Sequence, residues 1–184
     1  VGKESTQGTG VTADKDLGII KDLAPRLDRE LKIVETVGAV EDQAILAGNS
    51  SVGFSSTIEF QHGRILEMAL GTVAHAQTSS DWKHTFTINS SNLSTWTMDG
   101  SYDGSTDTKF RQLGNMIESL EIGIELNGNL TGNCTWKGLS TSSSATIGTK
   151  AISTLITFPH SLVTVEFDDV VVPEVQQFSV TIEN

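Results

Sequence analysis

The stretch that decides the fold is IESLEIGIELNGNLTGNCTWK, residues 117–137. Apolar and polar residues alternate on both sides of Asn127-Gly128, and a period of two is typical of half-buried β-strands. One face of the predicted hairpin is apolar, and its residues are Leu120, Ile122, Ile124, Leu126, Leu130, Gly132, Cys134 and Trp136. The other face is polar, mostly small and more acidic than basic, with Ser119, Glu121, Gly123, Glu125, Thr131, Asn133, Thr135 and Lys137. A sheet with one apolar and one wet face is typical of a sandwich or barrel wall.

The register of this hairpin depends on its turn. A two-residue turn at 127–128 would place Leu126 opposite Asn129 and would mix apolar with polar side chains. A three-residue loop over 127–129 places Leu126 opposite Leu130 instead. Because register follows the hydrophobic pattern, we predict the three-residue loop, with Asn129 in the left-handed conformation.

The composition and the remaining patterns fit one all-β domain over residues 1–184. The chain is long enough to bury a real core, and only 19% of its residues are charged. Further strands are predicted by apolar or alternating stretches at 33–37, 50–60, 84–88, 93–98, 152–158, 162–167 and 177–182. Helical spacing over 63–73 predicts one short helix. We therefore predict a two-sheet β-sandwich with one short flanking helix.

Two segments are expected to lie outside this core as an extended arm and an extended loop. Residues 1–16 are small and polar with three glycines, and they predict an N-terminal arm. Residues 38–50 are expected to form a long connection between two strands. Residues 99–108 and 138–149 predict polar, turn-rich loops. Segments with so few apolar residues are of the kind that becomes ordered on a neighbouring molecule.

The charge of the chain limits its partners. The formal net charge is −11, which argues against tight binding to nucleic acid because phosphate binding needs lysines and arginines. A negative surface is nevertheless what a conduit for DNA would need if the DNA must not stick. No apolar run approaches membrane-spanning length and no signal peptide is visible. Since the first residue is Val1 rather than Met, we expect the chain to be processed or incompletely represented.

No residue pattern predicts catalysis, a cofactor or a metal site, so we expect a protein that is not an enzyme. The four histidines are not spaced as metal pairs, and the acidic cluster Glu166, Asp168 and Asp169 closes a strand rather than a calcium loop. The single cysteine, Cys134, excludes an intrachain disulfide and is expected to be a buried, inert thiol. Five Asn-x-Ser/Thr triplets, starting at residues 49, 89, 92, 129 and 133, are expected to arise by chance in a chain rich in Ser and Thr.

The order of several short motifs resembles a known family over nearly the whole chain. A Glu-Ser-Thr-x-Gly-Thr segment at 4–9 is followed by Leu-Asp-Arg-Glu at 27–30 and a helix ending in Leu70-Gly71. A His-x-Phe-Thr strand at 84–87, the hairpin with Ser-Leu-Glu-Ile at 119–122, and a closing Phe-Ser-Val-Thr-Ile-Glu-Asn at 178–184 complete the order. This order resembles the tail tube (major tail) proteins of long-tailed viruses of bacteria and archaea. Similar proteins continue past the closing segment, so we expect a truncated chain or a short variant.

The resemblance implies hexameric rings of β-sandwich subunits, stacked into a tube whose lumen passes the viral DNA at infection. The implied partners are other copies of the chain, other tail proteins at the tube ends, and DNA in non-specific transit. The implied location is the virion tail after assembly in the host cytoplasm, without insertion of the subunit into a membrane.

The residues expected at the lumen and between rings follow from this resemblance together with the strand patterns. The lumen-facing set is Glu59, Ser119, Glu121, Glu125, Thr131, Asn133, Thr135 and Lys137. In the predicted register Lys137 is diagonal to Glu121 and partly neutralises it. Arms and loops of this family bridge successive rings, which implies contacts by Glu4, Thr6, Thr9, Val11, Glu41, Asp42, Ile45 and Leu46.

Two other classes of protein stay open from the sequence. A secreted β-sandwich subunit of a surface filament or adhesin would be favoured by occupied glycan sites. A carbohydrate-binding module would present aromatic side chains on an exposed sheet face, and Trp82, Trp96 and Trp136 are the candidates. Trp136 lies on the predicted core face, however, and the other two are not regularly spaced.

Overall fold

The computed structural model describes residues 1–34, 44–79, 81–89, 93–102, 108–143, 153–172 and 175–184. The fold is almost entirely β, as predicted. The elements in chain order are β1 Gly2–Lys3, β2 Ile19–Val34, β3 Ala44–Glu59, α1 Arg64–Leu70, β4 Gly71–Thr78, β5 Asp81–Ile88, β6 Trp96–Tyr102, β7 Thr108–Glu125, β8 Thr131–Gly138, β9 Ser140–Ser142, a 3-10 helix His160–Leu162, β10 Glu166–Phe167, β11 Val170–Val171 and β12 Gln177–Glu183.

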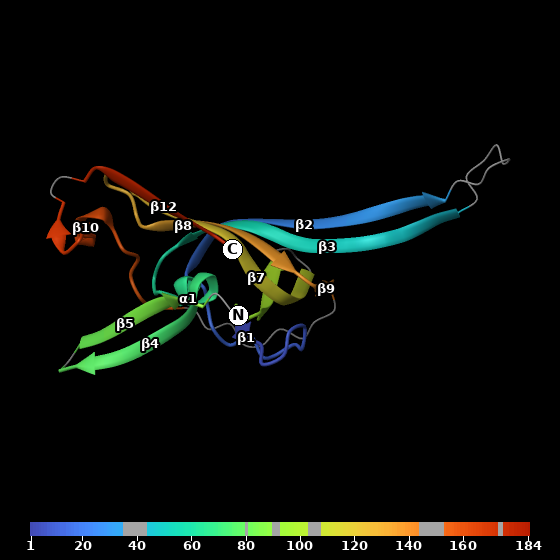
Figure 1. The fold of residues 1–184 in the computed structure, drawn as a ribbon, viewed down its shortest axis with the longest axis horizontal. Helices are drawn as coiled ribbons and strands as arrows, with labels where there is room; N and C mark the ends of the chain where they lie inside the picture. Colours follow the sequence, from blue (N-terminus) through green and yellow to red (C-terminus); the bar gives the residue numbers. More distant parts are fainter. Residues whose placement is uncertain (35–43, 80, 90–92, 103–107, 144–152, 173–174) are drawn as a thin grey trace.

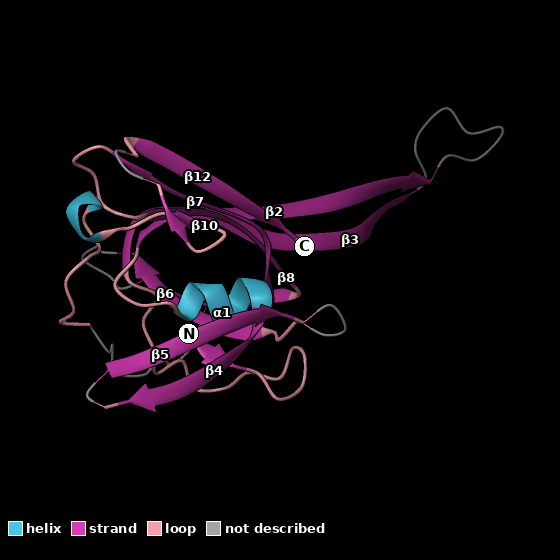
Figure 2. Cartoon of the chain, turned by 60° about the vertical axis from the view of Figure 1, so that its left-hand side comes forward, coloured by secondary structure: helices cyan, strands magenta, loops and turns pink. Residues whose placement is uncertain are grey.

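One large antiparallel sheet organises the molecule. Its strands follow the order β1-β6-β7-β8-β3-β2, and both β12 and β9 also pair with β7. The sheet curls so that the β1–β6 end lies below the β7–β8–β3 part, and together they enclose the core (Figures 1 and 2). Two separate ribbons, β4–β5 and β10–β11, complete the fold. This curled sheet with a second small sheet agrees with the predicted all-β sandwich.

The helix predicted over 63–73 is confirmed and shorter, at Arg64–Leu70. Helix α1 lies between the curled main sheet and the β4–β5 ribbon, and it contacts both (Figure 2). Its buried side chains are Ile65, Met68 and Ala69. It ends at Gly71, whose φ of 98° is a conformation that favours glycine, and the chain turns there directly into β4.

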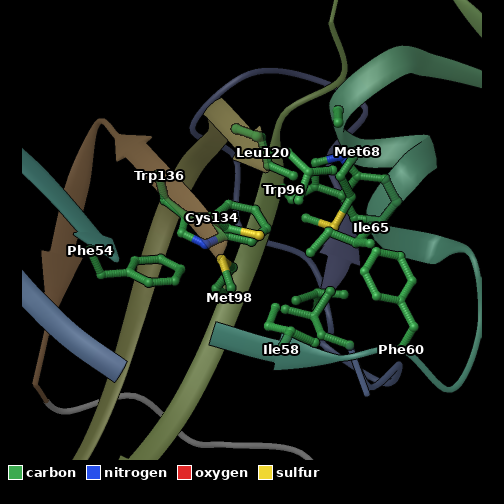
Figure 3. Packing of buried hydrophobic residues seen from close by; sticks show 14 residues of the cluster. Phe54, Ile58, Phe60, Ile65, Met68, Trp96, Met98, Leu120, Cys134 and Trp136 are labelled. Carbon is green, nitrogen blue, oxygen red and sulfur yellow. The ribbon is translucent and has the colours of Figure 1, made fainter. Parts of the chain in front are cut away.

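The core fills the space under the apolar face of the main sheet. Figure 3 shows Ile58 and Leu120 from the sheet close to Ile65 and Met68 from α1, with Trp96 from β6 beside them. At the other end of the cluster Phe54 stacks on Trp136 with ring centroids 5.1 Å apart. The Trp136 indole also donates a hydrogen bond to the buried hydroxyl of Ser56 at 3.0 Å, so its polar atom is satisfied.

Apart from Leu126, which lies in the turn and is 56% exposed, the two faces of the 117–137 hairpin are as predicted, but its register is wrong by two residues. Leu120 pairs with Cys134 rather than Trp136, and Gly123 with Thr131. The turn is therefore longer than three residues, and Asn127 rather than Asn129 has the left-handed φ, at 63°. A shift of two residues keeps every side chain on its own face, so the hydrophobic pattern could not distinguish the two registers. The register is instead fixed by further pairing partners: β3 beside β8, β12 beside β7, and a bridge from Asn129 to Pro159.

Several predicted segments differ from the structure. Strand β2 begins at Ile19 rather than residue 33, and it passes through Pro25. The predicted connection over 38–50 is strand β3 from Ala44 onward, while 38–43 lies outside the described residues. The predicted 99–108 loop is β6 up to Tyr102 and β7 from Thr108, with 103–107 outside the description. Of the 138–149 loop, residues 140–142 form β9, and 144–149 lie outside the described part. No strand forms over 153–158.

The N-terminal residues are not an uncovered arm throughout. Gly2–Lys3 pairs with β6, and the Val1 and Glu4 side chains are buried. Leu17 is also part of the core cluster. The segment was expected to lack enough apolar residues to pack, but pairing with β6 and the burial of Val1 and Leu17 hold its two ends.

Candidate functional site

A broad polar surface covers the outer face of the main sheet. Five strands contribute to it, in the order β2-β3-β8-β7-β12. Because directly paired residues of antiparallel strands share a face, the register defines its rows. One row holds Glu59, Thr131, Gly123 and Ser179; the next holds Asp22, Thr57, Asn133, Glu121 and Thr181; a third holds Ala24, Ser55, Thr135, Ser119 and Glu183. We call these rows, with their flanking residues Glu118, Glu125, Lys21 and Lys137, the polar face.

The polar face is rich in hydroxyls, amides and carboxylates. The Thr57 hydroxyl donates to the Asn133 side-chain oxygen at 3.0 Å, which links neighbouring strands. The side chains of Glu121, Glu125, Asn133, Thr135 and Lys137 are exposed. The core-facing partners on the same strands, among them Ile58, Leu120 and Cys134, are buried at 0–2% exposure. The two faces of one sheet are therefore sharply different, as the alternation predicted.

Carboxylates outnumber cations on this face. The acidic residues are Asp22, Glu59, Glu118, Glu121, Glu125 and Glu183, against Lys21, Lys137 and, in the row of Lys137, Arg26, which is itself paired with Asp28. Asp22, Glu121 and Glu183 line one shallow depression, whose other polar side chains are those of Ser and Thr residues and of Asn133. A surface of this kind repels phosphate groups, and salt screens that repulsion over about 10 Å at 0.1 M.

Glu59 differs from the other carboxylates because it is paired. Its carboxylate lies in an ion pair with the Lys21 ammonium and is only 7% exposed. The hydrogen bond from Lys21 holds the pKa of Glu59 below its ordinary value, against the opposing effect of burial. The irregular register between Ile20 and Asp22 accompanies this arrangement, since it changes the pairing of β2 at Lys21. Glu59 therefore contributes less free negative charge to the polar face than Glu121 and Glu125 do.

The structure brings the predicted face residues together and adds others. All eight, from Glu59 to Lys137, lie on the one face, but Lys137 pairs beside Met116 and Gly53 and is not diagonal to Glu121. Asp22, Glu118 and Glu183 were missed. Asp22 was missed because β2 was not recognised as a strand, and Glu118 because the bulge between Ile117 and Ser119 breaks the alternation. Glu183 could have been found from the alternation in 177–183.

The N-terminal Glu4 is the centre of a buried hydrogen-bond network. One carboxylate oxygen accepts from the Thr97 hydroxyl and the Gly114 N–H, each at 2.9 Å. The other accepts from the Thr95 hydroxyl at 2.9 Å and the Gly8 N–H at 2.8 Å. Burial alone would raise the pKa of Glu4, but these four donors outweigh it and hold the pKa below its ordinary value.

This network gives a structural reason for the glutamate and the glycine of the Glu-Ser-Thr-x-Gly-Thr segment. The Gly8 N–H lies four residues after Glu4 and closes a turn on its carboxylate, and Gly8 has a φ of 76° that favours glycine. Glu4 was predicted to contact another ring, but its carboxylate has its hydrogen-bond partners within its own subunit. Thr6 and Thr9 are exposed and Val11 is half-buried. Ile45 and Leu46 belong to β3, while Glu41 and Asp42 lie outside the described residues.

The β2–β3 hairpin extends beyond the sheet. Strand β8 pairs with β3 only from Val52 to Glu59, so residues 44–51 of β3 pair with β2 alone. At about 3.4 Å per residue this free part is roughly 27 Å long. Figure 1 shows it projecting from the domain at the end opposite β10.

The tryptophans do not form a carbohydrate-binding platform in the described structure. Trp96 and Trp136 are 1% and 2% exposed and belong to the core, which leaves Trp82 exposed at 60% on β5. In the described residues no group of three or more His, Cys, Asp or Glu side chains could hold a metal ion. Nor does any helix in the described residues have the length and apolar character needed to cross a bilayer.

Comparison with known proteins identifies the family. The family model described as phage tail tube protein matches residues 1–184, so the chain belongs to that family. The predicted resemblance is confirmed. No curated protein matches the sequence. Membership makes this a structural protein of the phage tail.

Proposed function

We propose that this phage tail tube protein assembles into hexameric rings that stack into the tail tube, and that the polar face lines its lumen. The genome would pass through this lumen into the host at infection. The partners are other copies of the chain and, at the two ends of the tube, other tail proteins. The subunit acts by assembly rather than by catalysis, and it assembles in the host cytoplasm before becoming part of the virion.

The observation that carries this proposal is the contrast between the two faces of one sheet. Core, α1 and the β4–β5 ribbon all lie on the apolar side, and none of these described elements covers the polar face. The strands β2 and β12 are the two edges of this part of the sheet, and strand edges are open to pairing with another chain. Rings of subunits joined near these edges would turn the polar face toward a common axis.

The charge of the polar face suits a conduit. Ring symmetry would repeat Glu121 and Glu125 around the bore, and stacking would repeat them along it. Phosphates would be repelled from every wall, while Ser, Thr and Asn side chains keep the surface wetted. DNA could then move without the lysine and arginine contacts that would hold it.

The projecting β2–β3 hairpin and the exposed residues of the N-terminal segment are proposed as the contacts between successive rings. A ribbon of two strands alone is marginally stable in water. Contact with a neighbouring ring would therefore stabilise this part of the subunit. Thr6, Thr9 and Val11 in the N-terminal segment and Ile45 and Leu46 in β3 are the described members of this contact set. Glu41 and Asp42, which lie outside the described residues, are its other expected members.

A cryo-electron-microscopy map of the assembled tube tests this proposal. The expected result is a stack of six-fold rings with Glu121 and Glu125 on the inner wall and the β2–β3 hairpin against the next ring. A tube with these glutamates on its outer wall would overturn the lumen assignment and leave the tube assignment intact. A protein that stays monomeric at high concentration with intact termini would count against self-assembly itself.

A further inference from the structure

The β4–β5 ribbon carries a pair of histidines that belongs neither to the core cluster nor to the polar face. His75 of β4 pairs directly with His84 of β5, so both side chains lie on the same face of the ribbon. Both are exposed, and the ribbon contacts the rest of the domain through α1. The pair therefore lies in solvent, apart from the polar face of the main sheet.

The two imidazole rings face each other through the same ring nitrogen. His75 Nδ1 and His84 Nδ1 are 2.7 Å apart, and the rings are nearly perpendicular, at 83°, with centroids 4.8 Å apart. One of the two nitrogens must carry a proton and the other a lone pair, because two lone pairs would repel at this distance. A change of tautomer in the protonated ring would turn both lone pairs toward one point.

We propose that His75 and His84 form a two-imidazole binding site for a divalent transition-metal ion such as Zn²⁺. Neutral imidazole nitrogen is a favoured ligand for such ions. Two Zn–N bonds of about 2.0–2.1 Å at a tetrahedral angle place the nitrogens roughly 3.3–3.4 Å apart. The rings need to separate by only part of an ångström, and exposed side chains can do this by small rotations. The Nδ1 proton moves to Nε2 of the same ring, so no net proton is released from the neutral pair.

The remaining coordination positions belong to water. In the described residues no third His, Cys, Asp or Glu side chain joins the pair. Lys83 precedes His84 and lies on the opposite face of the ribbon, paired with Ala76, so its charge does not point at the site. A bound ion would join β4 to β5 and would stiffen a ribbon that otherwise depends on strand pairing and its contact with α1.

Titration of the purified protein with ZnCl₂ in an isothermal calorimeter at about pH 7.5 tests the proposal, because imidazole must be neutral to bind metal. We expect one Zn²⁺ per chain. Replacing either partner, as His75→Gln or His84→Gln, should weaken binding by about tenfold or more, since the second ligand no longer adds its effective concentration. Lowering the pH should also weaken it, because protons compete with the metal ion for the imidazole nitrogens.

His160→Gln is the matched control, because it removes a histidine whose ring contacts the Val175 carbonyl and not the pair. It should bind Zn²⁺ as the unchanged protein does. Circular dichroism of each variant checks that the fold is kept, as expected for substitutions at two exposed positions. Absence of binding by the unchanged protein, or equal binding by all variants, would overturn the proposal and leave the pair as a hydrogen bond between two imidazoles. Neither result depends on whether the protein forms a tube.

Discussion

The Gly114 N–H donates a hydrogen bond of 2.9 Å to the Glu4 carboxylate, across 110 residues of sequence. Gly114 has a φ of 67°, and a Cβ at this position would lie 2.7 Å from the Leu139 side chain. The N-terminal segment is thus fastened to β7 at a point where the backbone conformation and the available space both favour glycine.

Replacing Glu4 with glutamine should destabilise the fold by about 1–3 kcal/mol, because the amide NH₂ would face two of the four donors and leave them unpaired. Chemical denaturation at neutral pH measures this loss. Glu121→Gln, at an exposed carboxylate, is the control and should change stability little. A Glu4→Gln variant as stable as the unchanged protein would show that the network contributes nothing.

The same network predicts a dependence of stability on pH. The pKa of Glu4 is lowered in the folded protein, so its contribution is present above the ordinary carboxyl pKa of about 4.3 and is lost as the pH falls through the folded value. The unchanged protein should therefore lose more stability between pH values of about 5 and 3 than the Glu4→Gln variant does. Parallel stability curves for the two proteins would contradict this prediction.

Cys134 should be inert in the folded protein. Burial raises the pKa of its thiol to about 12, against a lowering hydrogen bond from Ser56, so almost no thiolate forms at neutral pH. A thiol reagent such as Ellman's reagent should react only after unfolding in denaturant. A Ser142→Cys variant, which adds an exposed thiol on β9, should react at once. Rapid labelling of the unchanged native protein would refute the burial of Cys134.

Reversing two charges on the polar face should change passage of DNA but not folding. Glu121→Lys combined with Glu125→Lys alters two exposed positions, so the melting temperature should change little. If this face lines the lumen, tubes of the variant should retain DNA, and phage carrying it should eject their genome slowly. Asp14→Lys with Glu166→Lys makes the same change in net charge elsewhere and is the control. Equal ejection by both double variants would argue against the lumen assignment.

Removing the projecting hairpin should separate folding from assembly. Residues 30–49 can be replaced by Asn-Gly between Arg29 and Ser50, which already pair across the two strands. The core remains intact, so the variant should fold with a near-normal circular dichroism spectrum. We expect it to fail to form tubes in electron micrographs and sedimentation. Tubes formed in normal yield would show that the hairpin is not a contact between rings.

The sequence by itself determined the fold class, the two faces of the 117–137 hairpin and the position of the one predicted helix. These features depend on local periodicity, which can be read from the order of apolar and polar residues alone. The core positions of Leu120, Ile124, Cys134 and Trp136 follow from the same alternation. The order of short motifs also identified the family, since it needs no knowledge of contacts.

The tertiary structure alone decided the hairpin register, the strand at 19–34 and the burial of the N-terminal residues. A two-residue shift of register leaves the alternation unchanged, so only the pairing with β3, β12 and Pro159 could fix it. Strand β2 was not recognised because the irregularity between Ile20 and Asp22 interrupts its alternation, and its pairing with β3 shows that it is a strand. The role of Glu4 depends on donors from residues 8, 95, 97 and 114, which no local pattern brings together.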